Sequence, residues 1–557
     1  MAATDVPLIG AAGTSASASR CHEMMSLKWW QRGVIYQIYP RSFQDTNGDG
    51  IGDLAGIRQR LEHCASLGVD AVWLSPIYPS PLADFGYDVS DYTGVHPVFG
   101  TLGEFDQLVL HAGTLGLRII LDYVPNHTSD QHPWFAASRS SRSSSKRDWY
   151  LWRDPAPEGG PPNNWLSQFG GSAWEWDPHS GQYYYHAFLK EQPDLNWRNP
   201  EVRSAMYEVL RFWMRRGVAG FRVDVLWHLI KDDQWRDNPP NPQFRPGDPP
   251  SHSQIPLYNT DRPEVQALVA EMRSVVDEFA DRVLIGEIYL PVERLVAYYG
   301  TRLDGVHLPF NFHLLQTSWN AKSIASLIDM YERSIPPGGW PNWVLGNHDN
   351  PRIASRVGSL QARVAAMLLL TLRGTPTMYY GDELGMTNTL ISPERTQDCF
   401  EKRVPGLGLG RDPARTPMQW TAQEHAGFST AEPWLPVSDD YPVLNVESEQ
   451  ADHRSILLLY RKLLALRRSH AALTEGSYEP VSMTGDLLAY VRRSPYGSLL
   501  IALNLGKSPF TLLLASLSAR GQIILSTHLD QQPDTQIDAV ALRPSEGVIV
   551  QLIPSPG

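Results

Sequence analysis

The chain has 557 residues, of which 42% are hydrophobic, 10% aromatic and 19% charged, and its formal net charge is −12. This composition supports a large packed core and excludes disorder for most of the chain, and the lack of a basic stripe argues against nucleic acid or an anionic membrane surface as a partner. Three widely spaced cysteines, Cys21, Cys64 and Cys399, favour neither a disulfide framework nor a zinc cluster, so we expect a reducing compartment, the cytoplasm.

Residues 1–27 have the composition of a disordered tail. They lack a basic region followed by a sustained apolar stretch, so they do not resemble a secretory signal. No apolar run in the sequence approaches the roughly 18 residues that a membrane-spanning helix needs, and we therefore expect no membrane association.

The first motif along the chain is "DTNGDGIGD" at residues 45–53. Its spacing resembles the first half of an EF-hand, but the glutamate required at position 12 is replaced by Gly56. Oxygen ligands suited to Ca²⁺ or Mg²⁺ remain at Asp45, Asn47, Asp49 and Asp53 and at the carbonyl of Ile51. Two interpretations stay open at this point, a structural cation clip and a solvated Asn-Gly/Asp-Gly turn.

Short β-branched or aromatic runs then alternate with amphipathic, helix-like segments, several of which end before a glycine. The predicted strands start at Val34, Ala71, Arg118, Gly220, Val283, Gly305, Asn342 and Pro376. The predicted helices include the segments "LAGIRQRLEHCASLG", "LGEFDQLVLHAGTLG", "EVRSAMYEVLRFWMRRG", "PEVQALVAEMRSVVDEFA", "LQARVAAMLLLTLRG" and "SILLLYRKLLALRRS". Eight strand-helix units predict an α/β fold, a closed (β/α)₈ barrel.

Two long excursions interrupt this alternation. One follows the third strand and the other, at residues 385–454, follows the eighth; loops of such length are normally functional or form small domains. After Ala472 the pattern changes to short alternating strands. We therefore predict a barrel domain at 28–126 and 201–473, an inserted subdomain at 127–200 and a C-terminal antiparallel β-sandwich at 474–557.

Polar side chains mark the carboxyl ends of the predicted strands, where barrel enzymes carry their catalytic groups. The third strand ends near Asp122 and His127, the fourth in Arg222 and Asp224, the fifth in Glu287 and the seventh in His348 and Asp349. Carboxylates gathered in a cleft repel one another, so one of them keeps its proton and can act as a general acid. Glycoside hydrolysis needs such an acid and a second carboxylate, and neighbouring barrel strands would place Asp224 and Glu287 close enough for the retaining reaction.

The motifs "DYVPNH", "GFRVD", "IGEIY" and "NHD", in this order and at this spacing, resemble those of the α-amylase superfamily of retaining glycoside hydrolases, glycoside hydrolase family 13. The further motif "QPDLNW" resembles its α-glucosidase and oligo-1,6-glucosidase group. The resemblance covers roughly residues 28–555. It implies that Asp224 is the nucleophile, Glu287 the acid/base and Asp349 the stabiliser of the transition state.

The resemblance also implies further contacts. Asp84 would bind the terminal hydroxyls of the non-reducing glucose and Tyr87 would stack on that sugar. Arg411 would be the partner of Asp84, with Arg415 as a weaker candidate. The other implied substrate contacts are His127, Arg222, His348 and the aromatic residues at the entrance, Phe169 and Phe188. Asp45, Asn47, Asp49, Ile51 and Asp53 match the structural cation site of this group, Ca²⁺ or Mg²⁺.

The activity expected from this resemblance is that of an exo-acting α-glucosidase on small α-glucosides. One alternative keeps the covalent step but transfers or isomerises sucrose or maltose, and another is a non-catalytic scaffold. The preferred linkage stays open, because Val225 resembles α-1,6-acting members whereas "VDVLWHLIKDD" and "GEIYLP" depart from them. The sequence indicates no oligomeric state.

Overall fold

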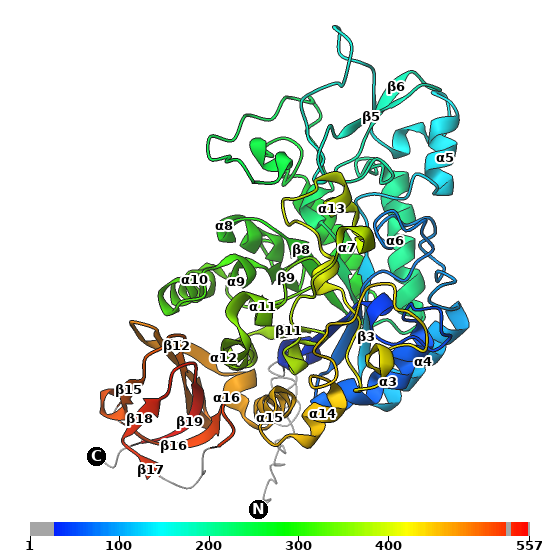
Figure 1. Ribbon diagram of the computed structural model, residues 1–557. Helices are drawn as coiled ribbons and strands as arrows, with labels where there is room; N and C mark the ends of the chain where they lie inside the picture. Colours follow the sequence, from blue (N-terminus) through cyan, green and yellow to red (C-terminus); the bar gives the residue numbers. More distant parts are fainter. Residues whose placement is uncertain (1–26, 518, 531–535, 555–557) are drawn as a thin grey trace, which may run out of the picture.

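The computed structural model describes residues 27–517, 519–530 and 536–554, with a barrel at its centre (Figure 1). Residues 1–26 of the predicted N-terminal tail at 1–27, Cys21 among them, lie outside the described residues.

Eight parallel strands form the closed barrel, in the order β1-β11-β10-β9-β8-β7-β3-β2. Their bounds are β1 Ile35–Ile38, β2 Ala71–Leu74, β3 Arg118–Tyr123, β7 Gly220–Val223, β8 Val283–Ile288, β9 Leu308–Asn311, β10 Asn342–Val344 and β11 Thr375–Tyr379. The eight predicted strands and the predicted barrel are therefore confirmed. Bulky side chains such as Trp73, Ile120, Ile285 and Phe310 fill the interior, so the barrel is a packed core with its open site at one end.

Helices surround the barrel, and several of them begin at polar residues that cap them. Asp53 caps α3, Asn199 caps α6 and Asn320 caps α10, each with a side-chain oxygen that accepts a backbone N–H of the first turn. The longer barrel helices are α3 Leu54–Leu67, α4 Leu102–Thr114, α6 Pro200–Arg215, α7 Val265–Asp277, α10 Ala321–Ser334, α12 Ser359–Thr371 and α15 Ile456–Ser469. The shorter ones are α2 Trp29–Arg32, α8 Val292–Leu295, α9 His313–Gln316, α11 Ile353–Val357, α13 Cys399–Arg403, α14 Val446–Ala451 and α16 Ala471–Thr474. Among the described residues, none of the helices is long and apolar enough to cross a bilayer.

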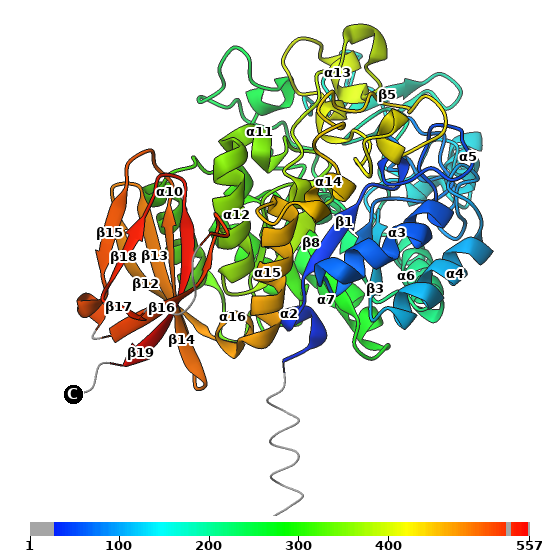
Figure 2. The ribbon, with the colours of Figure 1, turned by 60° about the horizontal axis from the view of Figure 1, so that its bottom comes forward.

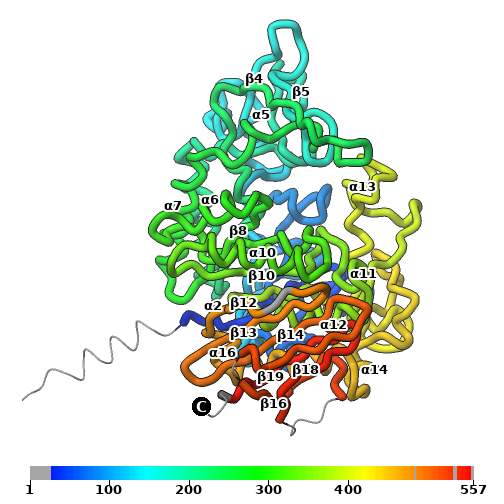
Figure 3. The backbone as a smooth tube through the Cα atoms, turned by 90° about the vertical axis from the view of Figure 1, so that its left-hand side faces the viewer, coloured from blue at the N-terminus to red at the C-terminus, as the bar shows by residue number. Residues whose placement is uncertain are grey.

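An inserted subdomain follows β3. It contains α5 Pro133–Ser140 and a three-stranded antiparallel sheet in the order β4-β6-β5, with bounds β4 Trp152–Arg153, β5 Trp174–Asp177 and β6 Gln182–Tyr185. The subdomain stands at the top in Figures 1 and 3, at the opposite end of the molecule from the C-terminal sheet.

The C-terminal region consists of antiparallel strands beside α10, α12 and α16 (Figure 2). A six-stranded sheet has the order β12-β13-β14-β19-β16-β17, and β15 pairs with β18. The bounds are β12 Ser477–Thr484, β13 Leu487–Ser494, β14 Gly497–Asn504, β15 Phe510–Leu513, β16 Ala519–Ser526, β17 Gln536–Ile537, β18 Ala539–Leu542 and β19 Gly547–Pro554. Leu500, Val540 and Val548 belong to one buried cluster between the two sheets, as a sandwich requires.

Candidate active site

The register of the barrel strands brings acidic groups together at the mouth of the barrel. β7 and β8 pair in parallel with the residues before Asp224 and Glu287 opposite each other, so these two acids stand at one level. On the other side of β7, Arg222 is opposite Asp122 of β3. Residues two apart on a strand share a face, so Arg222 and Asp224 point the same way.

Arg222 lies at the centre of this group. Its Nη1 is 2.6 Å from Asp122 Oδ1 and 2.8 Å from Asp224 Oδ1, and its Nη2 is 2.8 Å from Glu287 Oε2. Asp224 and Glu287 thus bind the same guanidinium, which is compatible with the roughly 5 Å that separates the two carboxyl groups of retaining glycosidases.

Backbone strain lies beside the same group. Val225 has φ 38° and ψ 46°, a left-handed conformation that β-branched residues rarely adopt. In this conformation the backbone N–H of Val225 donates a 2.8 Å hydrogen bond to Glu287 Oε2. Strain of this kind persists where the surroundings enforce it, and here it fixes the direction of a candidate catalytic carboxyl group.

Three carboxyl groups share one buried guanidinium, and this affects their ionisation. Burial raises the pKa of Glu287 against the lowering effect of Arg222, and the nearby Asp349 raises it further. Burial also raises the pKa of Asp224 and of Asp122, again against Arg222. The group therefore keeps a proton at pH values where isolated carboxyl groups have lost theirs, which is the state a general acid needs.

Asp349, in contrast, is held in its ionised form. Burial opposes its ionisation, but His348, Arg415 and Arg411 outweigh burial and lower its pKa. Arg415 Nη2 lies 2.8 Å from Asp349 Oδ1, and Arg411 Nη1 lies 3.4 Å from the same atom. Burial lowers the pKa of His348 to about 3, so at neutral pH the two arginines carry the positive charge beside Asp349.

Asp84 occupies one end of the site together with Arg411. Its Oδ1 is 2.7 Å from Arg411 Nη2, and its Oδ2 accepts a 3.3 Å hydrogen bond from Gln192 Nε2. The same amide nitrogen lies 3.2 Å from Nε2 of His127. Gln192 therefore links the inserted subdomain to two predicted substrate contacts.

Tyr87 forms a flat face in the same region. Its ring lies parallel to that of His348, with a centroid separation of 5.5 Å and an interplanar angle of 0°. Its hydroxyl lies 2.7 Å from His348 Nε2 and donates a 3.1 Å hydrogen bond to Asp122 Oδ2. The ring is thereby fixed in an orientation that suits stacking against a sugar.

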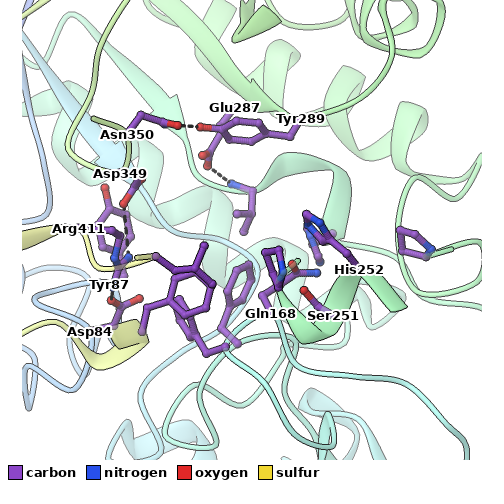
Figure 4. A pocket seen from close by; sticks show the side chains of 18 of the residues that line it. Asp84, Tyr87, Gln168, Ser251, His252, Glu287, Tyr289, Asp349, Asn350 and Arg411 are labelled. Atoms are coloured by element: carbon purple, nitrogen blue, oxygen red, sulfur yellow. Dashed lines mark hydrogen bonds and ion pairs between the residues drawn. The ribbon is translucent and has the colours of Figure 1, made fainter. Parts of the chain in front are cut away.

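These side chains face one cavity of about 660 Å³ (Figure 4). The predicted site residues that line it are Asp84, Tyr87, His127, Phe169, Phe188, Asp224, Glu287, Asp349 and Arg411. Arg222 and His348 lie behind this lining, with 1% and 0% of their surface exposed. Figure 4 shows Asp84, Tyr87, Asp349 and Arg411 on one side of the cavity and Gln168, Ser251 and His252 on the other.

Part of the cavity wall comes from a loop that the sequence analysis did not single out. It lies between β7 and α7 and contributes Asn238, Pro249, Ser251, His252, Gln254, Pro256, Asn259 and Thr260. Asn238 N donates to Asn164 Oδ1 at 2.9 Å and Gln254 Nε2 donates to Asn164 O at 2.6 Å, so the loop is attached to the inserted subdomain. In the sequence, only the length of this loop and its lack of helical or strand periodicity indicate that it could be functional.

The loop at 45–53 is organised by its own acidic side chains. Asp45 accepts backbone N–H groups of Asn47, Gly48 and Gly50, and Asp53 accepts those of Thr46 and Gly56. Asp45 and Asp53 are each 5% exposed, and in the part of the chain that the structure describes neither forms an ion pair.

The donor set of this loop fits a hard cation, because all of its candidate ligands are oxygen atoms and two of the carboxylates are buried without a basic partner. The carboxylates of Asp45, Asp49 and Asp53 do not converge within 4.8 Å of one another, so a bound ion would have to draw them together.

Closed parallel barrels carry their catalytic groups at the carboxyl ends of the strands, where the acids of this chain gather. The chain matches the family model described as "Alpha amylase, catalytic domain" over residues 37–476, and it belongs to this family. It is 45% identical over 479 residues to a "Probable alpha-glucosidase" of Rhizobium meliloti (strain 1021), covering 83% of this chain and 87% of the relative.

Solved structures of similar proteins include an enzyme described by glucosyl transfer and one described as a synthase. An alpha-glucosyl transfer enzyme, XgtA, superposes with a TM-score of 0.90 at 38% identity, covering 95% of this chain and 100% of the other. The trehalulose synthase MutB from Pseudomonas mesoacidophila MX-45 gives a TM-score of 0.87 at 34% identity, with 95% and 100% coverage. An inactive double mutant of MutB is known in complex with isomaltulose.

Proposed function

We propose that this protein is a retaining, exo-acting α-glucosidase that releases α-glucose from the non-reducing end of short α-glucosides. The observation that carries the proposal is that Asp224, Glu287 and Asp349 line one cavity, with the first two bound to a single guanidinium. Membership of the α-amylase family and the similarity to an α-glucosidase support it.

In the first step Glu287 donates its proton to the glycosidic oxygen while the bond from that oxygen to the anomeric carbon breaks. Asp224 attacks the anomeric carbon from the opposite face and forms a β-glucosyl ester, and the aglycone leaves as a neutral alcohol. In the second step Glu287, now ionised, takes a proton from water as the water oxygen displaces Asp224. Two inversions give α-glucose.

Arg222 and Asp349 assist different parts of this sequence. Arg222 lies 2.8 Å from Asp224 and stabilises its ionised, nucleophilic form. Asp349 has a lowered pKa and stays negative, so it stabilises the positive charge that develops at the anomeric carbon.

Asp84 and Arg411 would bind the terminal hydroxyls of the glucose and close the site behind it, which makes the reaction exo-acting. Tyr87 would stack on the sugar, with His127, Phe169 and Phe188 beside it. His348 would reach a hydroxyl only after a shift, because it is fully buried behind Tyr87.

A second candidate function is transfer or isomerisation by the same glucosyl ester, with a sugar replacing water. The similarity to XgtA and to MutB favours it as an alternative. Following free glucose against new disaccharide over time from sucrose and from maltose separates the two, because hydrolysis gives glucose in step with substrate loss. The hypothesis of a non-catalytic scaffold has weaker support, since Asp224, Glu287 and Asp349 all line one cavity.

The loop at 45–53 is proposed as a structural Ca²⁺ or Mg²⁺ site held by Asp45, Asn47, Asp49, the carbonyl of Ile51 and Asp53. A bound ion would supply positive charge that joins the carboxylates and stiffens the loop. None of the reaction steps depends on it.

The experiment that tests the proposed function is glucose release from maltose, isomaltose, sucrose, kojibiose and trehalose, with the anomer of the first glucose read by NMR. The proposal expects release from at least one substrate, with α-glucose formed before mutarotation. No release from any of the five, or β-glucose as the first product, would overturn it.

A further inference from the structure

Arg411 is bound by three carboxylates, of which two face the cavity and one does not. Asp84 and Asp349 line the cavity, whereas Asp398 is fully buried and is not part of the lining. Asp398 belongs to none of the motifs that predict the site. Its contacts with Arg411 are nevertheless the most extensive of the three.

Asp398 holds Arg411 through both of its oxygen atoms. Oδ1 accepts hydrogen bonds from Arg411 Nε at 3.0 Å and from Nη2 at 2.6 Å, and Oδ2 accepts one from the backbone N–H of Arg411 at 2.8 Å. Asp84 contacts Nη2 alone at 2.7 Å, and Asp349 contacts Nη1 at the longer distance of 3.4 Å. The position of the guanidinium is therefore set mainly from behind, by Asp398.

The charge on Asp398 is also secure. Burial opposes its ionisation, but Arg411 and Arg415 outweigh burial and lower its pKa to about 2. At neutral pH the residue is thus a fixed negative charge on the side of Arg411 that faces away from the cavity.

A bound metal is a poorer explanation of this cluster. The ligand atoms of Asp84, Asp398 and Cys399 lie within 4.8 Å of one another. Arg411 Nη2 already contacts all three, at 2.7 Å, 2.6 Å and 3.3 Å. Burial and the nearby Asp84 raise the pKa of the Cys399 thiol, so the sulfur is protonated and is a weak metal ligand.

We propose that Asp398 is a positioning residue that draws the guanidinium of Arg411 back from Asp349, so that Asp84 and Asp349 keep oxygen lone pairs free for the hydroxyls of a bound glucose. Without Asp398, the strongest remaining partners of Arg411 would be these two carboxylates. A guanidinium that saturated them would compete directly with sugar hydroxyls. This inference rests on the proposed glucose site.

The experiment is a double-mutant cycle of D398N and R411A, read as kcat and KM on the best α-glucoside of the substrate panel and as the inhibition constant of glucose. Asparagine keeps the shape of Asp398 but removes its charge. We expect D398N to raise KM and the inhibition constant about tenfold or more. In the R411A background the same change should have almost no further effect, because it acts through Arg411.

A matched control is D177N in the inserted subdomain. Asp177 is also fully buried, and it accepts Arg139 Nε at 2.9 Å on one oxygen and a backbone N–H at 3.0 Å on the other. It is not part of the cavity lining. D177N should leave KM and the glucose inhibition constant within about twofold, whatever its effect on the melting temperature.

Equal effects of D398N with and without Arg411, or a change confined to the melting temperature as in D177N, would overturn the inference. If D398N fails to fold, D398E keeps the charge and displaces it, and the same dependence on Arg411 is expected. A wild-type protein that turns over none of the α-glucosides refutes the proposed function, whereas an active wild type with an additive cycle refutes only the role of Asp398.

Discussion

Two regions of this molecule concentrate carboxylates, and they use them differently. In the loop at 45–53, Asp45 accepts backbone N–H groups of the same loop, and Asp53 accepts those of Thr46 in the loop and of Gly56 in the first turn of α3. At the barrel mouth, Asp122, Asp224 and Glu287 all converge on Arg222.

The difference shows that acidic residue types alone do not make a reactive site. The loop carboxylates accept hydrogen bonds from backbone N–H groups, so these bonds stabilise the conformation of the loop. Those at the mouth share one buried guanidinium, and burial raises their pKa against the lowering effect of Arg222. Asp224 and Glu287 also face a cavity. Isosteric substitutions should therefore change activity at the mouth and stability in the loop.

The largest effect is expected for D224N. Asparagine cannot attack the anomeric carbon, so kcat/KM should fall by about 10⁴-fold or more. The melting temperature should be unchanged or higher, because the substitution removes a buried carboxyl group that is raised in pKa. Steady-state kinetics and thermal unfolding of the same preparation check both parts, and a folded D224N with more than a tenth of wild-type activity contradicts the role of Asp224.

E287Q should show a smaller loss that depends on the leaving group. Without the acid, kcat/KM should fall by about 10²–10⁴-fold for disaccharides and much less for an aryl glucoside whose phenolate leaves unprotonated. The activity of the wild type should decline on the alkaline side with an apparent pKa above the ordinary value for glutamate of roughly 4.3, since the proton of the raised group is lost there. This alkaline decline of activity should be absent for E287Q on the aryl substrate. If the decline persists unchanged in E287Q, it reports the ionisation of another group.

D45N is expected to lower stability and to leave activity nearly unchanged. It weakens three backbone contacts of the loop and the proposed cation site, so the melting temperature should fall by several degrees while kcat/KM stays within about threefold. A chelator should lower the melting temperature of the wild type and should lower that of D45N by less. Equal chelator sensitivity of both proteins would remove the cation from this loop.

The barrel was predictable because each of its strands is a short β-branched or aromatic run between turn residues, and the acids fall at the ends of those runs. The residues that form the walls of the cavity were not predictable in this way. Ser251 and His252 lie in a loop without periodicity, and Asp398 is one of many acidic residues in the excursion at 385–454, so no local pattern marks any of the three. Arg415, the weaker candidate for the partner of Asp84, instead contacts Asp349 at 2.8 Å, closer than Arg411 does. No local pattern predicts this contact, because residues 349 and 415 come together only in the folded chain.

The central claim, that Asp224 forms a covalent bond to glucose, is tested most directly by trapping that bond. A fluorinated glucosyl fluoride that forms the ester quickly and hydrolyses it slowly should inactivate the enzyme, and mass spectrometry of its peptides should place one sugar on the peptide that contains Asp224. A sugar attached to Glu287 or to any other residue, or turnover of natural substrates with inversion at the anomeric carbon, would contradict the account.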